Sequence, residues 1–543
     1  MVSATTCLVF VGASALAVRL VLSISARRAK KRALRKVPGP PSASFLTGNL
    51  AELNDAEGVE FLERVLKEYG PISKLHGIAG DIVLCTSDPQ ALSYILQKEA
   101  DSFYEVDLTG TTVILEYMFG PGLVSTNGPR HRRQRRMLNP LFSTAHMRRS
   151  ASLVHSITLK YREYLLAETK KSAGSVDVAP GLARLALEVI SQVGFGHSFR
   201  ALDGGSSDYI LASKEILPSI TGLAPFIIPF VASGLSSLPP TLLRTAGAGL
   251  ATILPALKSL MRGVDTIFLH ARRIWEAKKA AFASGDAVLK ESVTQGGDLL
   301  SVLLKENALA TGADKLPDDE LLAQLNTLIV AGAESTSTAV CCMLYHLALA
   351  PKVQDDLRAE IVQAGEDLGY DALMNLPLLD AVCRETMRKH AFFPYRSRLA
   401  VKAAVIPFAN GETLYIPAGT EVVMSNHGLN VDPAIWGPDA HEWRPARWLE
   451  PLPESVVAAK IPGVYSNSTS FGSGPKSCIG YTLAVLEMKS ALAVLLPSFA
   501  FELPADHEIV WRSGITLSPS VKGEKGFNAT MPMQVRRVEG AAT

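Results

Sequence analysis

The sequence contains few cysteines and almost no net charge, and it lacks two common nucleotide-binding motifs. Its 6 cysteines show neither CxxC pairs nor zinc-site spacing, which indicates a reducing compartment rather than a disulfide framework. The 54 Lys and Arg residues nearly balance the 52 Asp and Glu residues, so the overall charge gives no reason to expect a nucleic-acid partner. Gly247-Ala248-Gly249 does not complete a dinucleotide fingerprint, and we find no phosphate loop. A chain of 543 residues that is 48% hydrophobic can still form a large core.

The amino-terminal segment is apolar and is followed by a basic cluster. No charged side chain occurs between residues 2 and 18, and after Arg19 the apolar character continues to Ile24. This length is close to that of one membrane-spanning helix. The Lys and Arg residues from Arg27 to Lys36 follow the apolar run, whereas a cleaved secretory signal carries its positive charge before it. We therefore predict a single-pass anchor in the endoplasmic reticulum membrane over residues 1–36, with the rest of the chain cytoplasmic; a tilted or shallow anchor is the alternative.

The remainder, residues 37–543, is predicted to be one mainly α-helical domain with a small β part. Val37-Pro38-Gly39-Pro40-Pro41 cannot continue a helix and marks the domain boundary. Residues 72–75 and 82–85 are typical of short strands, while most later segments have helical spacing. Between Ile216 and Leu260 repeated prolines interrupt an apolar stretch. We expect short apolar helices there, partly in the core and partly against lipid, with a second transmembrane span as the alternative.

One long apolar helix is predicted from about Pro317 to Leu349, because proline and acidic residues suit its first turn and Pro351 follows its end. Its apolar pattern is interrupted at Ala331-Gly332-Ala333-Glu334-Ser335-Thr336. Polar groups inside a buried helix need a reason.

The strongest chemical signal is the segment FGSGPKSCIG, from Phe471 to Gly480. Its glycines, Gly472 among them, permit a tight loop whose backbone can approach a flat ligand closely. They place Cys478 just before a predicted helix, where backbone N–H groups favour a thiolate, the form that binds iron. A small buried cysteine in a glycine-rich turn is the alternative.

The signature FxxGxxxCxG is matched by Phe471, Gly474, Cys478 and Gly480. The sequence therefore resembles the cytochrome P450 family, to which this signature belongs. The resemblance extends from the proline break to the segment after Cys478. It implies the family's mostly helical fold and haem b, with the Cys478 thiolate as axial ligand of the iron. Lys476 stands where the family usually has arginine, and would contact a haem propionate as a point charge.

Other segments fit the same resemblance. Glu385 and Arg388 match the family's ExxR pair, and Arg447 in Trp443-Arg444-Pro445-Ala446-Arg447-Trp448 would complete a structural network that holds the cysteine loop. Arg398 follows Pro394 at the spacing of a strand arginine that contacts a haem propionate.

His131 and Arg135, four residues apart in a predicted helix, would likewise contact propionates. The neighbouring Arg132, Arg133 and Arg136 are expected to form a basic surface that receives an acidic redox partner, or simply a solvated face. Glu334 followed by Ser335 stands where the family has an acid and a threonine. Either Ser335 or Thr336 could relay protons to bound dioxygen, and Gly332 would let the helix open over the haem; hydroxyls bonded to backbone carbonyls are the alternative.

The resemblance therefore implies a monooxygenase that inserts one oxygen atom into a lipophilic molecule, such as a terpenoid, steroid, fatty acid or aromatic compound. Apolar segments near residues 108–118 and 217–238 would line its pocket and a membrane-side entrance. Electrons would come from NADPH through a separate cytochrome P450 reductase, with cytochrome b5 as a second donor. A haem isomerase or dehydratase, and a haem-binding sensor without turnover, are the rival functions.

Overall fold

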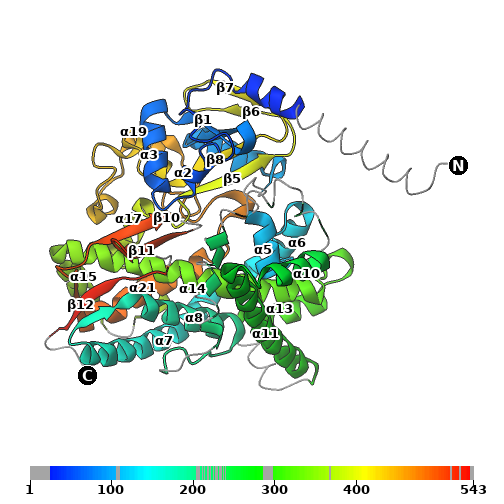
Figure 1. Ribbon diagram of the computed structural model, residues 1–543. Helices are drawn as coiled ribbons and strands as arrows, with labels where there is room; N and C mark the ends of the chain where they lie inside the picture. Colours follow the sequence, from blue (N-terminus) through cyan, green and yellow to red (C-terminus); the bar gives the residue numbers. More distant parts are fainter. Residues whose placement is uncertain are drawn as a thin grey trace.

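The chain folds into a helical body that carries a small sheet region at one end (Figure 1). The computed structural model describes residues 25–538, except 105–110, 204–207, scattered positions between 211 and 239, 285–296, 366–367, 514–515 and 525–527. The apolar part of the predicted anchor, and parts of the two predicted pocket segments, lie outside the described residues. The anchor stays a prediction.

Helices make up most of the described chain, as predicted. The longer ones are α3 (Gly58–Tyr69), α5 (Thr111–Phe119), α6 (Gly128–Leu138), α7 (Thr144–Lys171), α8 (Val178–Phe195), α10 (Pro240–Leu250), α11 (Pro255–Ala283), α13 (Leu299–Leu309), α14 (Asp318–Leu349), α15 (Pro351–Ala364), α17 (Pro377–Lys389) and α21 (Tyr481–Ser498). The short ones are α2 (Leu50–Leu53), α4 (Pro89–Ser93), α16 (Tyr370–Met374), α18 (Asn426–Asn430), α19 (Pro433–Trp436) and α20 (Glu454–Ala459).

The largest sheet has the strand order β1-β2-β8-β5-β3. Its members are β1 (Ile72–His76), β2 (Ile82–Thr86), β8 (Glu421–Ser425), β5 (Tyr395–Ala400) and β3 (Phe103–Tyr104). Only β2 and β8 pair in parallel. The two predicted strands are confirmed as β1 and β2. The remaining strands form the hairpins β6 (Ala404–Pro407) with β7 (Thr413–Ile416) and β10 (Ile509–Ser513) with β11 (Leu517–Val521), and a sheet of β4 (Ser175–Asp177), β12 (Pro532–Arg537) and β9 (Phe499–Glu502).

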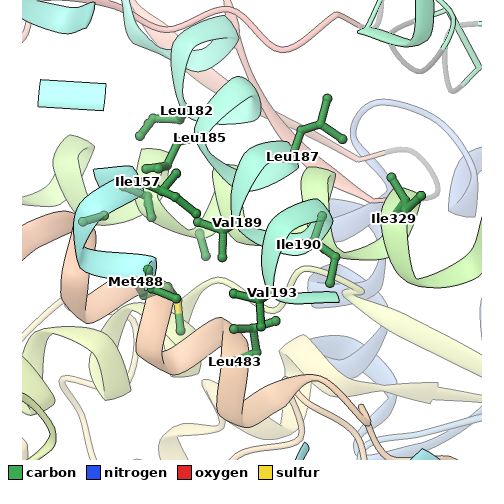
Figure 2. Packing of buried hydrophobic residues seen from close by; sticks show 14 of the residues in the cluster. Ile157, Leu182, Leu185, Leu187, Val189, Ile190, Val193, Ile329, Leu483 and Met488 are labelled. Carbon is green, nitrogen blue, oxygen red and sulfur yellow. The ribbon is translucent and has the colours of Figure 1, made fainter. Parts of the chain in front are cut away.

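The predicted long helix is confirmed as α14, which begins after Pro317 and ends at Leu349. It packs against α8, and Figure 2 shows the apolar side chains of α8 between those of α7, α14 and α21. At Gly332 an added Cβ would lie 2.8 Å from Ile190 Cγ1. The glycine therefore permits close packing of α14, which is a continuous helix there, against α8. The opening of the helix over the haem stays a prediction.

Three described helices, α8, α14 and α21, are long and apolar enough to cross a membrane. However, 78%, 61% and 67% of their apolar windows, respectively, are buried within the protein. Their hydrophobicity is therefore explained by the core.

The apolar stretch between residues 216 and 260 is broken where the prolines predicted it. α10 ends at Leu250, and α11 begins at Pro255. The described side chains of α10 are mostly exposed or half-buried, including Leu242 and Leu250. Contact of this region with lipid stays a prediction.

The basic cluster before the proline break is in contact with the folded body. Residues 25–33 are helical, and the buried Lys30 pairs with Asp81 at 2.5 Å between Nζ and Oδ2. Lys30 also donates to the Gly419 carbonyl at 3.2 Å, and Leu34 is fully buried. This segment therefore ties the chain to the sheet region before residue 37.

Candidate functional site

The cysteine loop has a tight, hydrogen-bonded geometry. The Cys478 N–H donates to the Phe471 carbonyl at 2.8 Å, and α21 begins three residues after the cysteine. Gly472 and Gly474 have φ values of +71° and +66°, which favour glycine. A Cβ on Gly474 would lie 1.8 Å from the Leu96 carbonyl oxygen, so the loop is pressed against η2 (Tyr94–Lys98). The loop thus holds Cys478 in one place.

Cationic side chains from three segments surround this loop. Arg135 of α6 donates from Nη1 to the Ser477 carbonyl at 2.5 Å and from Nη2 to Ser477 Oγ at 3.4 Å. Lys476 donates to the Thr126 carbonyl at 2.5 Å. Arg396 of β5 lies close to Gly472, since a Cβ there would be 3.5 Å from its Nη1.

The surroundings of Cys478 act on the pKa of its thiol in opposite directions. Burial raises the pKa of the Cys478 thiol above its ordinary value, while the Gly480 backbone N–H and the charges of Arg396 and Arg135 lower it only in part. Burial therefore outweighs the backbone donor and the two cations. A coordinated metal ion would supply further stabilisation of the thiolate, because a coordinating thiol is deprotonated outright.

The predicted structural network comes together in the core. Glu385 and Arg388 are both fully buried and form two hydrogen bonds of 2.9 Å. Arg447 Nε lies 3.4 Å from Glu385 Oε1 and also pairs with Asp439 at 3.0 Å. Burial alone would raise the pKa of Glu385, but hydrogen bonding and the positive charge of Arg388 outweigh it and hold the pKa below its ordinary value.

Arg388 also donates to three backbone carbonyls. Its Nη1 bonds the Asn430 and Ala440 oxygens at 2.8 and 2.7 Å, and its Nη2 bonds the Glu442 oxygen at 3.0 Å. The Asn430 side chain in turn accepts from the Thr469 N–H at 3.0 Å, just before the cysteine loop. The network is therefore linked to that loop by direct hydrogen bonds.

His131 and Arg135 share one face of α6, and His131 is buried. The predicted basic surface beside them is only partly present. Arg132 and Arg136 are exposed and pair with Asp101 and Asp314.

Arg133 was predicted on the same basic surface, but it does not belong to it, because its side chain pairs with the buried Glu320 at 2.7 Å. Glu320, in the first turn of α14, also accepts from Arg130 Nε at 2.9 Å and Gln134 Nε2 at 2.7 Å. Burial alone would raise the pKa of Glu320, but these three donors hold it below its ordinary value. Arg133 thus joins α6 to α14 instead of forming part of a solvated face.

The polar interruption of α14 is more accessible than the residues on either side. Ala331 is exposed and Glu334 and Ser335 are half-buried, whereas Thr336 is buried. The Ser335 hydroxyl donates to the Ala331 carbonyl at 2.8 Å. The accessible part of the helix therefore carries Glu334 and Ser335 but not Thr336. The Ser335 hydroxyl makes the hydrogen bond to a backbone carbonyl that the sequence offered as the alternative to proton relay.

Arg396 and Glu320 were missed by sequence reasoning. Arg396 stands two residues before Arg398, so strand alternation places both on one face of β5 and could have identified it. Arg398 is buried and donates from Nη1 to the Ser397 carbonyl at 2.9 Å. Glu320 was recognised only as an acidic residue of a helix start. Nothing local in the sequence indicates its partners on α6.

The donor set around the loop fits haem. Cys478 is partly accessible and supplies one soft ligand suited to iron. Arg135 and Arg396 influence its charge directly, and Arg398, Lys476 and His131 add further donors on neighbouring segments. A thiol ringed by cations matches a metal centre whose porphyrin carries two carboxylates.

Comparison with known proteins points to the same family. The family model "Cytochrome P450" matches residues 38–520. The chain is 39% identical over 521 residues to Cytochrome P450 monooxygenase 91 of Postia placenta, covering 93% of this chain and 94% of that protein. It is 35% identical to Cytochrome P450 monooxygenase 81 of the same fungus, with 96% of each chain covered. It is 36% identical to a protein named ganoderic acid synthetase from Ganoderma lucidum, with 94% of each chain covered.

The fold, the cysteine loop and these relatives agree over almost the whole described chain. The chain belongs to the cytochrome P450 family, whose cofactor is haem, and it is a monooxygenase of that family.

Proposed function

We propose that this chain inserts one oxygen atom of dioxygen into a lipophilic small molecule, with haem b bound through Cys478 and electrons supplied by NADPH through a separate membrane-bound reductase. When bound, the haem supplies dioxygen activation and oxygen transfer, and the second oxygen atom leaves as water. The observation that carries the proposal is the fixed position of Cys478, in a loop held against η2 by Gly474 and surrounded by cationic side chains.

Each residue of the site has a proposed task. Cys478 would bind the iron, and the Phe471–Gly472 backbone would contact the cofactor. Arg135, Arg398, Lys476 and His131 donate to the propionates, and we add Arg396 to this set because its charge acts on Cys478. The buried network of Glu385, Arg388 and Arg447 keeps the loop in place.

Proton delivery is assigned to α14. The Ser335 hydroxyl donates its own proton to the Ala331 carbonyl, so its oxygen stays able to accept a hydrogen bond from water. Glu334, half-buried beside it, is placed to exchange protons with solvent. Thr336 is assigned a packing role because its side chain is buried.

The iron ligand is tested by the carbon monoxide spectrum of the reduced holoenzyme. We expect the red-shifted Soret band of thiolate ligation in the wild type and in Cys383→Ala, whose cysteine is buried in α17. Cys478→Ala should lack the band. An intact band in Cys478→Ala would refute the assignment.

Oxygen insertion is tested by NADPH consumption with the reductase and a library of terpenoids, steroids, fatty acids and aromatic compounds. Because one relative is named ganoderic acid synthetase, compounds related to ganoderic acid but with fewer oxygen atoms are the first to test. Substrate-dependent NADPH uptake with an oxygenated product supports a monooxygenase. Conversion of an oxygenated substrate without NADPH would instead indicate an isomerase or dehydratase, and haem binding without any turnover a sensor.

The proposed membrane topology is tested at two glycosylation sequons. Asn467 and Asn528 are both exposed, so each would be available to the glycosylation machinery in the lumen. We expect neither to be modified in a eukaryotic host, since the domain is cytoplasmic. A glycan on either residue would reverse the proposed orientation.

A further inference from the structure

A wide groove lies at the start of the folded body and shares no residue with the candidate haem site. Its volume is about 1130 Å³, larger than most small-molecule pockets. The walls come from residues 31–38, the start of β1 and the β6–β7 hairpin. In Figure 1 these segments lie together at the end of the molecule that carries β1, β6 and β7.

The groove is strongly cationic. Lys31, Arg32, Arg35 and Lys36 line it and are all exposed. Within the described residues none of the four forms an ion pair, unlike the neighbouring Lys30 with its partner Asp81. The one acidic side chain in the lining is Glu412, whose carboxylate accepts a hydrogen bond from Asn410 at 3.0 Å. The groove therefore presents several positive charges without compensation, which favours an anionic ligand.

Apolar side chains lie next to these charges. Ile72 and Leu414 of the lining are half-buried, whereas Phe408 is almost completely buried and belongs to the core behind the lining. A groove lined by both exposed cations and apolar side chains suits an amphiphile with an anionic head better than a free inorganic anion.

Two exposed apolar residues also lie outside the lining of the groove. Phe45 is 82% exposed and Leu46 is 61% exposed. The Leu46 carbonyl accepts from the Ala79 N–H at 2.9 Å, and Arg27 donates to the Ala79 carbonyl at 3.3 Å. These contacts place the apolar pair beside the basic helix. Large apolar side chains exposed beside cations are typical of a surface that lies in the headgroup region of a bilayer.

We propose that this groove binds one anionic phospholipid, with Lys31, Arg35 and Lys36 contacting its phosphate and Ile72 and Leu414 contacting its glycerol and first methylene groups. The inference rests on the proposed membrane anchor, because residues 1–24 immediately precede the basic cluster and would bring the groove to the membrane surface. It adds a lipid class and a defined binding site to that attachment.

The test uses full-length holoenzyme in nanodiscs of phosphatidylcholine with a minor fraction of phosphatidylserine. Native mass spectrometry of the protein released from the discs counts the lipids that stay bound. We expect one phosphatidylserine, enriched over its share of the bilayer. Arg35→Gln with Lys36→Gln should reduce the enrichment about 25-fold, because each cation near an anionic surface contributes about fivefold in affinity.

A matched control is Lys160→Gln with Lys305→Gln, which removes the same charge from exposed positions on α7 and α13. An unchanged carbon monoxide spectrum in both double variants verifies their folding, since none of the four residues belongs to the haem site. Equal losses of phosphatidylserine enrichment in the two double variants would overturn the groove as the binding site and would indicate general attraction of the lipid to the charged surface. Displacement of the lipid by millimolar inorganic phosphate would reassign the site to a free anion.

The design separates this inference from the anchor. Stable incorporation into discs of every composition, without enrichment of phosphatidylserine, would overturn the lipid site and leave the anchor intact. Failure to enter discs of any composition would overturn the anchor, and the lipid site with it.

Discussion

Glu385→Gln is the substitution whose effect the structure defines best. The carboxylate and its partner Arg388 are both 0% exposed, and Arg447 is nearly as buried. Glutamine keeps the shape but removes the charge that offsets two buried guanidinium groups, and its amide nitrogen would face donors. Breaking a buried ion pair on one side costs about 3–5 kcal/mol, because the remaining charge is left without compensation in a medium of low polarity. We expect a loss of this size.

The measurement is urea denaturation of the holoenzyme followed by tryptophan fluorescence, with the haem-to-protein ratio as a second readout. Trp448 donates to Glu385 Oε2 at 2.9 Å, so the fluorescence reports on the network itself. The matched control is Asp356→Asn, which breaks the exposed pair of Asp356 with Lys352 and should leave the midpoint within error of the wild type. Equal midpoints for the two variants would refute the reasoning.

The same carboxylate predicts a pH dependence. The folded pKa of Glu385 is lowered, so the stabilisation is complete above the unfolded value of about 4.3 and is lost as the pH falls through the folded pKa. In Glu385→Gln this acid-dependent part of the denaturation midpoint should disappear.

Three further predictions concern other parts of the molecule. Gly474→Ala should lower the haem-to-protein ratio of the purified enzyme severely, since its Cβ would meet the Leu96 carbonyl at 1.8 Å; full haem content would show that this close approach does not hold the loop. Ser335→Ala should reduce product formed per NADPH consumed by about 10²-fold or more while NADPH uptake continues, because a positioned group on a proton path contributes about 10²–10⁴-fold, and Ser335→Thr should restore it; unchanged coupling in the alanine variant would remove Ser335 from the proton path. His346 forms a hydrogen bond with His390 at 2.6 Å, and burial lowers the pKa of His346 from 6.5 to about 3. Between these two pH values the unfolded chain binds more protons than the folded chain, so the thermal midpoint should fall as the pH drops below 6.5. His346→Leu should flatten this dependence of the midpoint on pH, and an identical slope in the variant would count against the buried neutral imidazole.

Much of the fold could be predicted because its signals are local. α14 follows from proline and acidic residues at its start and a proline after its end, and β1 and β2 follow from short β-rich runs between turns. The cysteine loop was equally clear, since its glycines mark a strained turn before a helix. In each case neighbouring residues carry the information, so no knowledge of the tertiary structure was needed.

The prediction that failed depends on a partner distant in the sequence. Arg133 was interpreted as a surface cation, but its partner Glu320 lies 187 residues away and is buried. Likewise, the close neighbour of Gly332 is Ile190 on another helix, which the sequence around the glycine does not reveal. The spacing of residues along one helix predicts which face of the helix a residue occupies. Which residues pack against that face is known only from the tertiary structure.

The cysteine shows how local and distant information combine. Its position before α21 suggested that helix and backbone donors would make it a thiolate, yet burial outweighs them and raises the pKa of Cys478. The two cations that oppose burial, Arg135 and Arg396, come from α6 and β5, and the loop is held by contacts to Leu96 and Thr126. Four separate segments therefore fix the position and the surroundings of this sulfur. The fold positions the proposed ligand, and a coordinated metal would complete its ionisation.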